Sequence, residues 1–168
     1  MRVPRSFATL VLAAGMAAGC GSSDPLGPDF ETRLSVLGGC GDVWFYAVDA
    51  ADEVLVTFSA PGLIEAAEGE TTTSTFDLPD DGVELIVEVG SYISDAVCDD
   101  VIENGPRVDR TWRAVAGEAV VTIRPQGESW GARGDLRLTD VVLRDDDGHT
   151  VVIERLDWSD IFVGWLPG

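Results

Sequence analysis

The chain contains no lysine, and arginine supplies all 11 basic residues against 30 acidic ones. The formal charge of −19 at pH 7 argues against nucleic acid or an anionic lipid surface as a partner, because both are themselves negatively charged. His149 is the one histidine, so there is no second imidazole for a transition-metal site. The composition therefore argues against binding of polyanions and against a metal site built from several histidines.

Long apolar runs are also missing, apart from one near the N-terminus. Residues 7–18 are apolar except for Thr9 and Gly15, and Arg2 and Arg5 precede them. A membrane-spanning helix needs roughly 20 such residues, so a run of about 12 is too short for a permanent span. Positive charge, a short apolar helix and then small residues are the order of a secretory signal, so we expect an exported protein.

The small residues end in Ala17-Ala18-Gly19-Cys20, which resembles the lipobox of bacterial lipoprotein precursors. The resemblance implies that residues 1–19 are a signal peptide and that Cys20 is acylated, which would anchor the chain to membrane lipid. Its one departure is Ala17, where the motif usually has leucine. Gly21 resembles the sorting signal of outer-membrane lipoproteins. The expected location is therefore the bacterial cell envelope, at the outer membrane.

A second stretch, Leu37-Gly38-Gly39-Cys40, matches the lipobox letters more closely. Proline and charged residues occupy the segment before it, where an apolar helix is required. Cys20 is therefore the predicted lipidation site, and Cys40 and Cys98 remain. Two cysteines left over in an exported protein most simply pair as a disulfide. The alternative, a metal or redox pair, lacks a CxxC spacing and a nearby histidine.

The rest of the chain has the size of one domain. Residues 20–30 are rich in Gly, Ser and Pro, which predicts the lipidated cysteine and a flexible tether, with the folded domain over residues 31–168. After Asp42, β-branched and aromatic runs alternate with turn residues. This pattern predicts an all-β sandwich or barrel, and a single β-sandwich with immunoglobulin-like or similar Greek-key topology is the first choice.

The expected elements follow from alternation and turn chemistry. The run Val141-Val142-Leu143 is apolar on both faces, so a bulge or a fully buried stretch is expected after Asp140. Strands are expected over residues 43–48, 54–58, 71–76 and 83–89, hairpins over 111–116 with 118–124 around Gly117 and over 135–144 with 149–158, a short helix over 63–68, and a final strand over 161–168.

One motif suggests catalysis. Gly127-Glu128-Ser129-Trp130-Gly131 matches the GxSxG elbow of α/β-hydrolases, and His149 lies downstream. An elbow needs a strand before it and a helix after it, whereas here Pro125 precedes and a predicted strand follows. The favoured interpretation is a loop between strands in a protein that is not an enzyme. A serine hydrolase using Ser129 and His149 is the lesser alternative.

Acidic residues gather at predicted turns, among them Asp49, Asp52 and Glu53. The densest group is Asp145-Asp146-Asp147 before Gly148. Calcium takes six to eight oxygen ligands, often from closely spaced acids, so Asp145, Asp146 and Asp147 are the candidate calcium site. The group lacks the EF-hand spacing, and aspartate suits turns in any case. No cofactor is predicted, with calcium as the open alternative.

Five tryptophans are many for this length. Trp44 and Trp112 lie in strand patterns and are expected in the core. Trp130, Trp158 and Trp165 lie near loops or the C-terminus, where exposed rings would suit a glycan or protein partner. The alternative is further core packing, since aromatic residues usually serve burial.

The leading hypothesis is a noncatalytic, lipid-anchored envelope protein with a structural or binding role. Its partner would be an unknown protein or glycan. The domain resembles, in general style, small envelope lipoproteins of GC-rich Gram-negative bacteria. The second hypothesis is a carbohydrate-binding or adhesion module, with calcium assisting.

Overall fold

The structure is a computed structural model, and it describes residues 26–27, 30–95, 97–98, 102–126 and 131–165. Within these ranges the chain forms strands almost throughout, with two short helices, so the all-β prediction is confirmed. The elements in chain order are η1 (Phe30–Arg33), β1 (Leu34–Cys40), β2 (Trp44–Asp49), β3 (Val54–Ser59), α1 (Leu63–Ala66), β4 (Thr72–Asp77), β5 (Glu84–Ser91), β6 (Arg107–Pro125), β7 (Gly131–Asp145) and β8 (Thr150–Gly164).

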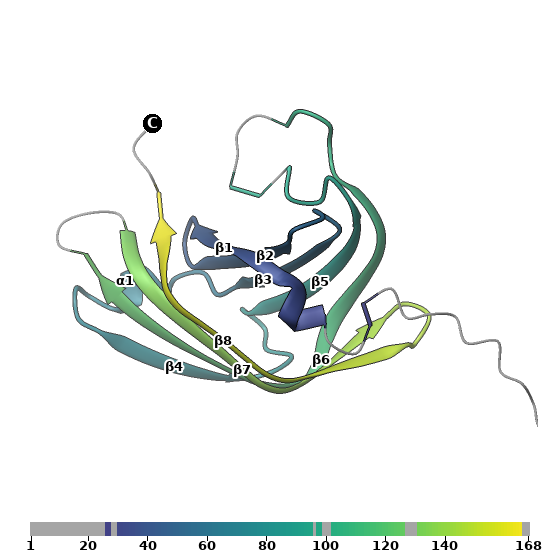
Figure 1. Cartoon of the computed structure of the whole chain (residues 1–168). Coiled ribbons are helices and arrows are strands. Elements are labelled where there is room, and N and C mark those ends of the chain that lie inside the picture. Colours follow the sequence, from purple (N-terminus) through teal and green to yellow (C-terminus); the bar gives the residue numbers. More distant parts are fainter. Residues whose placement is uncertain (1–25, 28–29, 96, 99–101, 127–130, 166–168) are drawn as a thin grey trace, which may run out of the picture.

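All the described strands belong to one antiparallel sheet rather than to two packed sheets. Its order is β1-β2-β3-β5-β6-β7-β8, and β4 pairs with the second half of β6. An antiparallel bridge between Gly41 and Gly164 links the two ends of this series, so the sheet curls into a nearly closed barrel. The predicted sandwich is therefore wrong. Figure 1 shows β6, β7 and β8 curving across the molecule opposite β1, β2 and β3.

The length of β6 explains this difference. Its 19 residues pair with β5 over Arg107–Arg113 and with β4 over Glu118–Ile123, while β7 follows its other edge. The single bent strand β6 therefore pairs with β5 in one half and with β4 in the other, whereas a sandwich would use separate strands in its two sheets. The sequence pattern predicts a hairpin at Gly117, but the chain continues through it, with register shifts on both sides.

Gly117 lies within β6, at a register shift against β7, and not at a turn. Its φ of 123° lies in a region that other residues avoid, and a Cβ there would lie 2.5 Å from the Cα of Val141. The backbone N–H of Leu78 donates to its carbonyl oxygen at 2.8 Å. Glycine therefore lets β6 bend where β7 approaches it most closely.

We expect Gly117→Ala to lower the free energy of unfolding by about 3 kcal/mol, because backbone strain and overpacking each cost about 1–3 kcal/mol. Urea denaturation would measure it. Gly82→Ala is the matched control, because no atom lies within 4 Å of a Cβ built there. Equal stability of the two variants would contradict the assigned role of Gly117.

The bulge expected after Asp140 is present, and a second one matches it. Asp140 has a φ of 50° where β7 shifts register against β6, and Asp160 has a φ of 58° where β8 shifts against β7. Aspartate tolerates this left-handed conformation better than most residues. Thr139-Asp140 and Ser159-Asp160 thus place similar bulges in neighbouring strands.

The other local predictions compare directly with the described strands. The strands expected over 43–48, 54–58, 71–76 and 83–89 correspond to β2, β3, β4 and β5, and the helix expected over 63–68 to α1. The hairpin predicted from residues 135–144 and 149–158 is formed by β7 and β8, with Arg144 opposite Thr150. The tail expected as a separate strand instead continues β8 as far as Gly164.

The barrel interior is filled by apolar side chains from every wall and from the N-terminal segment. Leu26 and Phe30 are each only 1% exposed and belong to the core. The sequence places both in the flexible tether, whereas the structure packs them against the barrel. The largest fully buried side chains of the strands are those of Phe45, Phe58, Leu85, Trp112, Ile123, Leu136, Leu138, Leu143 and Ile153.

Candidate functional site

The turn between β7 and β8 contains a buried acidic group with three charged or polar contacts. The Asp145 side chain is 2% exposed, and its Oδ1 accepts the backbone N–H of His149 at 2.7 Å. Oδ2 lies 2.9 Å from Nδ1 of His149 and 3.6 Å from Nη1 of Arg110. Burial raises the pKa of Asp145, but the hydrogen bonds from His149 and the electrostatic interactions with His149 and Arg110 outweigh it and leave the pKa lowered. The ionised carboxylate of Asp145 therefore stabilises the turn by accepting these hydrogen bonds.

The predicted calcium trio is not the group that the fold brings together. Donor atoms of Asp145, Asp147 and His149 lie within 4.8 Å of one another, and Asp146 is not among them. Calcium prefers six to eight oxygens, and this group offers two carboxylates and a ring nitrogen beside a guanidinium. The donor set does not fit calcium.

Of the two residues proposed for a hydrolase, Ser129 and His149, the structure describes only His149. Ser129 lies outside the described residues. The motif around it is preceded by β6 and followed by β7, whereas a nucleophile elbow requires a helix after it. His149 follows the far end of β7, where Nδ1 is engaged by Asp145. The elements described on either side of residues 127–130 are both strands, and the predicted loop itself lies outside the described residues.

The candidate binding tryptophans do not form one surface among the described residues. Trp158 is 4% exposed and packs in the barrel core, whereas Trp165 is 68% exposed. Trp130 lies outside the described residues. Trp112 is fully buried as expected, with the Arg110 guanidinium 5.5 Å from its ring centroid, and Trp44 is half-buried. Burial of Trp158 removes it from the proposed contact surface.

Arginine–aspartate pairs join β6, β7 and β8. Arg124 donates to both carboxylate oxygens of Asp135, whose Oδ1 also accepts the backbone N–H of Asp160 at 2.8 Å. The side-chain hydrogen bond from Arg124 holds the pKa of Asp135 below its usual value. On β8, Asp157 accepts hydrogen bonds from Arg137 of β7 and from Arg155 of its own strand. These bonds fix the register of the strands and hold the Asp160 bulge.

Asp135→Asn is expected to lower stability at pH 7 by no more than about 1 kcal/mol, because the pair is over a third exposed to water. A lowered folded-state pKa contributes stability that is present above the unfolded pKa near 3.8 and lost as pH falls through the folded value. The difference between wild type and variant should therefore vanish in acid, as urea titrations at several pH values would measure. Glu154→Gln is the control, and a difference independent of pH would contradict the assignment.

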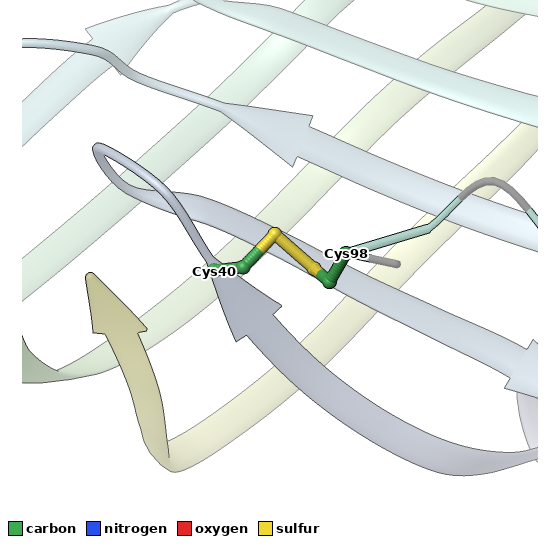
Figure 2. The surroundings of a disulfide bond; sticks show 2 residues. All are labelled: Cys40 and Cys98. Carbon is green, nitrogen blue, oxygen red and sulfur yellow. A yellow bond between two sulfur atoms is a disulfide. The ribbon is translucent and has the colours of Figure 1, made fainter. Parts of the chain in front are cut away.

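A second apolar cluster, which the sequence pattern does not predict, lies on the outer face of the barrel. The chain after β5 folds back over β1, β2 and β3, where Ile93 packs with Val48 and Leu55 outside the core. A disulfide joins Cys98 to Cys40 at the end of β1, as predicted (Figure 2). The bridge therefore tethers this segment to the sheet.

A pocket of about 430 Å³ opens beside this cluster. The carboxylates of Asp49 and Asp52 lie at the β2–β3 turn, where Asp49 Oδ1 accepts the N–H groups of Glu53 at 2.8 Å and Val54 at 3.0 Å. Asp52 Oδ1 accepts the N–H of Ser94 at 3.0 Å. The pocket is lined by Val36, Tyr46, Val48, Asp49, Ala50, Asp52, Ser94 and Val97. The acidic turn is visible in the sequence, but no signal there places the later loop against it.

Within the described ranges, the chain has no helix that is long and apolar enough to span a membrane. Comparison with protein-family models, with curated proteins and with solved structures found no match to this chain.

Proposed function

We propose that the chain is a lipid-anchored β-barrel protein of the bacterial envelope, held at the outer membrane by acylated Cys20, with a noncatalytic binding or structural role. The observation that carries the proposal is the use of the three cysteines. Cys40 and Cys98 are joined in a disulfide, which is typical of exported proteins. The third thiol stands where a secretory signal ends.

The start of the folded domain supports an anchor close to the barrel. Leu26 is already buried in the core, six residues after Cys20. A fully extended chain spans at most about 3.6 Å per residue, so the lipidated residue would lie no more than about 20 Å from Leu26. The mature chain of residues 20–168 keeps nine arginines and 30 acids, a charge of −21 that does not attract it to anionic lipid. The acyl chains would therefore supply the attachment.

The chemistry of the described polar groups supports a noncatalytic role. Asp145 and His149 are bonded to each other within a turn, and Asp135 and Asp157 are bonded to arginines across strands. The pocket beside Asp49 and Asp52 supports binding. The glycan-binding alternative loses support because Trp158 lies in the core.

Mass spectrometry of the protein from the membrane fraction tests the anchor. We expect a mature N-terminus at Cys20 that carries a lipid mass, together with an intact bridge between Cys40 and Cys98. A mature N-terminus beyond residue 20, or an unmodified Cys20 thiol in the mature protein, would overturn the proposal.

A further inference from the structure

We propose that the outer-wall pocket binds a small organic ammonium ion with an apolar body. The pocket lies between the outer face of β1 and β2, the β2–β3 turn and the disulfide-tethered segment after β5. Its volume of about 430 Å³ is within the range of small-molecule sites. This inference goes beyond the lipid anchor and does not depend on it.

The walls of the pocket suit the apolar part of such a ligand. Val36, Val48 and Val97 bring aliphatic side chains from two strands and the tethered segment. The Tyr46 ring lies directly over Gly38 on the neighbouring strand, since a Cβ on that glycine would be 2.3 Å from the ring. This contact holds the ring in place as an aromatic wall, which also attracts cations.

The charged groups of the pocket suit a cation. Asp49 and Asp52 contribute two carboxylates, and none of the described residues that line the pocket is basic. The hydrogen bonds of both carboxylates to described residues use Oδ1, which leaves each Oδ2 to accept from a ligand ammonium. Calcium would need six to eight oxygens, whereas five of the eight lining residues have aliphatic or aromatic side chains.

The disulfide decides whether the pocket is complete. Ser94 and Val97 form one wall, and both come from the segment that Cys98 ties to Cys40. The hydrogen bond from the Ser94 N–H to Asp52 and the packing of Ile93 against Val48 and Leu55 hold the same segment against β2 and β3. Without the bridge this wall is no longer tied to the outer face of β1, so binding should depend on oxidation.

Phenethylamine tests the proposal by NMR titration of the purified protein, with phenylacetate and phenethyl alcohol as probes of the same size. We expect saturable shifts at the amides of Ser94 and Val97 with phenethylamine, and affinity at least about tenfold lower for the two control compounds. Equal affinity for the three compounds would overturn the proposal, as would the absence of saturable shifts.

Asp52→Asn is the sharpest variant, because the amide oxygen can still accept the Ser94 N–H bond while the charge is removed. It should weaken phenethylamine binding about tenfold. Asp81→Asn removes the same charge from the β4–β5 turn, outside the pocket, and should leave the affinity unchanged. Equal losses of affinity in both variants would show a general effect of net charge and overturn the proposed site.

Reduction of the disulfide should weaken phenethylamine binding by at least as much as Asp52→Asn. Unchanged affinity after reduction would contradict the role of the bridge.

Discussion

Replacement of Cys20 by alanine is expected to move almost all of the protein from the membrane fraction to the soluble fraction of the envelope. Each buried methylene of an acyl chain contributes about 0.8 kcal/mol to membrane binding, and a second chain makes the anchor stable. Without the acyl chains, the charge of −21 expected for residues 20–168 does not favour attachment to an anionic lipid surface. Cell fractionation and detergent phase partitioning would measure the shift.

Cys40→Ala is the matched control for this experiment. Cys40 ends the stretch that fits the lipobox letters best, yet it lies at the end of β1 and is bonded to Cys98. The Cys40 variant should therefore remain in the membrane fraction, although its domain is less stable. Retention of the Cys20 variant in the membrane, or loss of the Cys40 variant, would contradict the assignment of the anchor.

Local patterns predicted most of the strands because each strand has a buried and an exposed face. The alternation Val83, Leu85, Val87 and Val89 identifies β5, and the residues at 85 and 87 are buried. The same reasoning missed β1, whose Gly38-Gly39 pair is typical of a loop. Close neighbours in the fold explain why both positions need glycine. The Tyr46 ring lies over Gly38, and the Phe162 carbonyl oxygen approaches Gly39. Tyr46 lies on the next strand along the chain, whereas Phe162 is far away in the sequence, and neither contact is visible in the pattern of residues 34–40.

Barrel closure and burial of the N-terminal segment could not be predicted for a similar reason. The bridge between Gly41 and Gly164 joins the two edges of the sheet, and neither glycine has a side-chain pattern that indicates a partner. Leu26 stands alone among Gly, Pro and Asp, so periodicity says nothing of its burial. These contacts depend on how the long strands bend, and the strands shift register at Gly117, Asp140 and Asp160.

The candidate pocket shows the same limit. The sequence identifies the acidic turn of Asp49 and Asp52 and the pairing of Cys40 with Cys98 as separate features. Only the fold shows that the disulfide brings Ser94 and Val97 to that turn. A disulfide predicted by counting cysteines therefore fixes a contact between distant segments, but not the surface that the contact creates.

Removal of the disulfide is expected to lower the free energy of unfolding by about 4 kcal/mol, the chain-entropy value for a loop of this length. The two cysteines are 58 residues apart, and the closed loop contains β2, β3, β4 and β5. The double variant Cys40→Ala/Cys98→Ala should therefore unfold at lower urea concentration. Its barrel should still form in water, because the main core lies on the other face of the sheet from the tethered segment.

Hydrogen exchange separates the global from the local part of this effect. In the double variant, the amides of Ser94 and Val97 should exchange much faster than those of β6 and β7, because they lie outside the strand ladder. Their segment is then held by the Asp52 bond, local hydrogen bonds such as that from the Val97 N–H to the Ser94 carbonyl, and the packing of Ile93 and Val97. A reducing agent should reproduce both changes in the wild type and have no effect on the double variant, which is the internal control. Uniform acceleration throughout the barrel would instead mean that the bridge stabilises the fold as a whole, and the tethered segment would then have no separate role in shaping the outer wall.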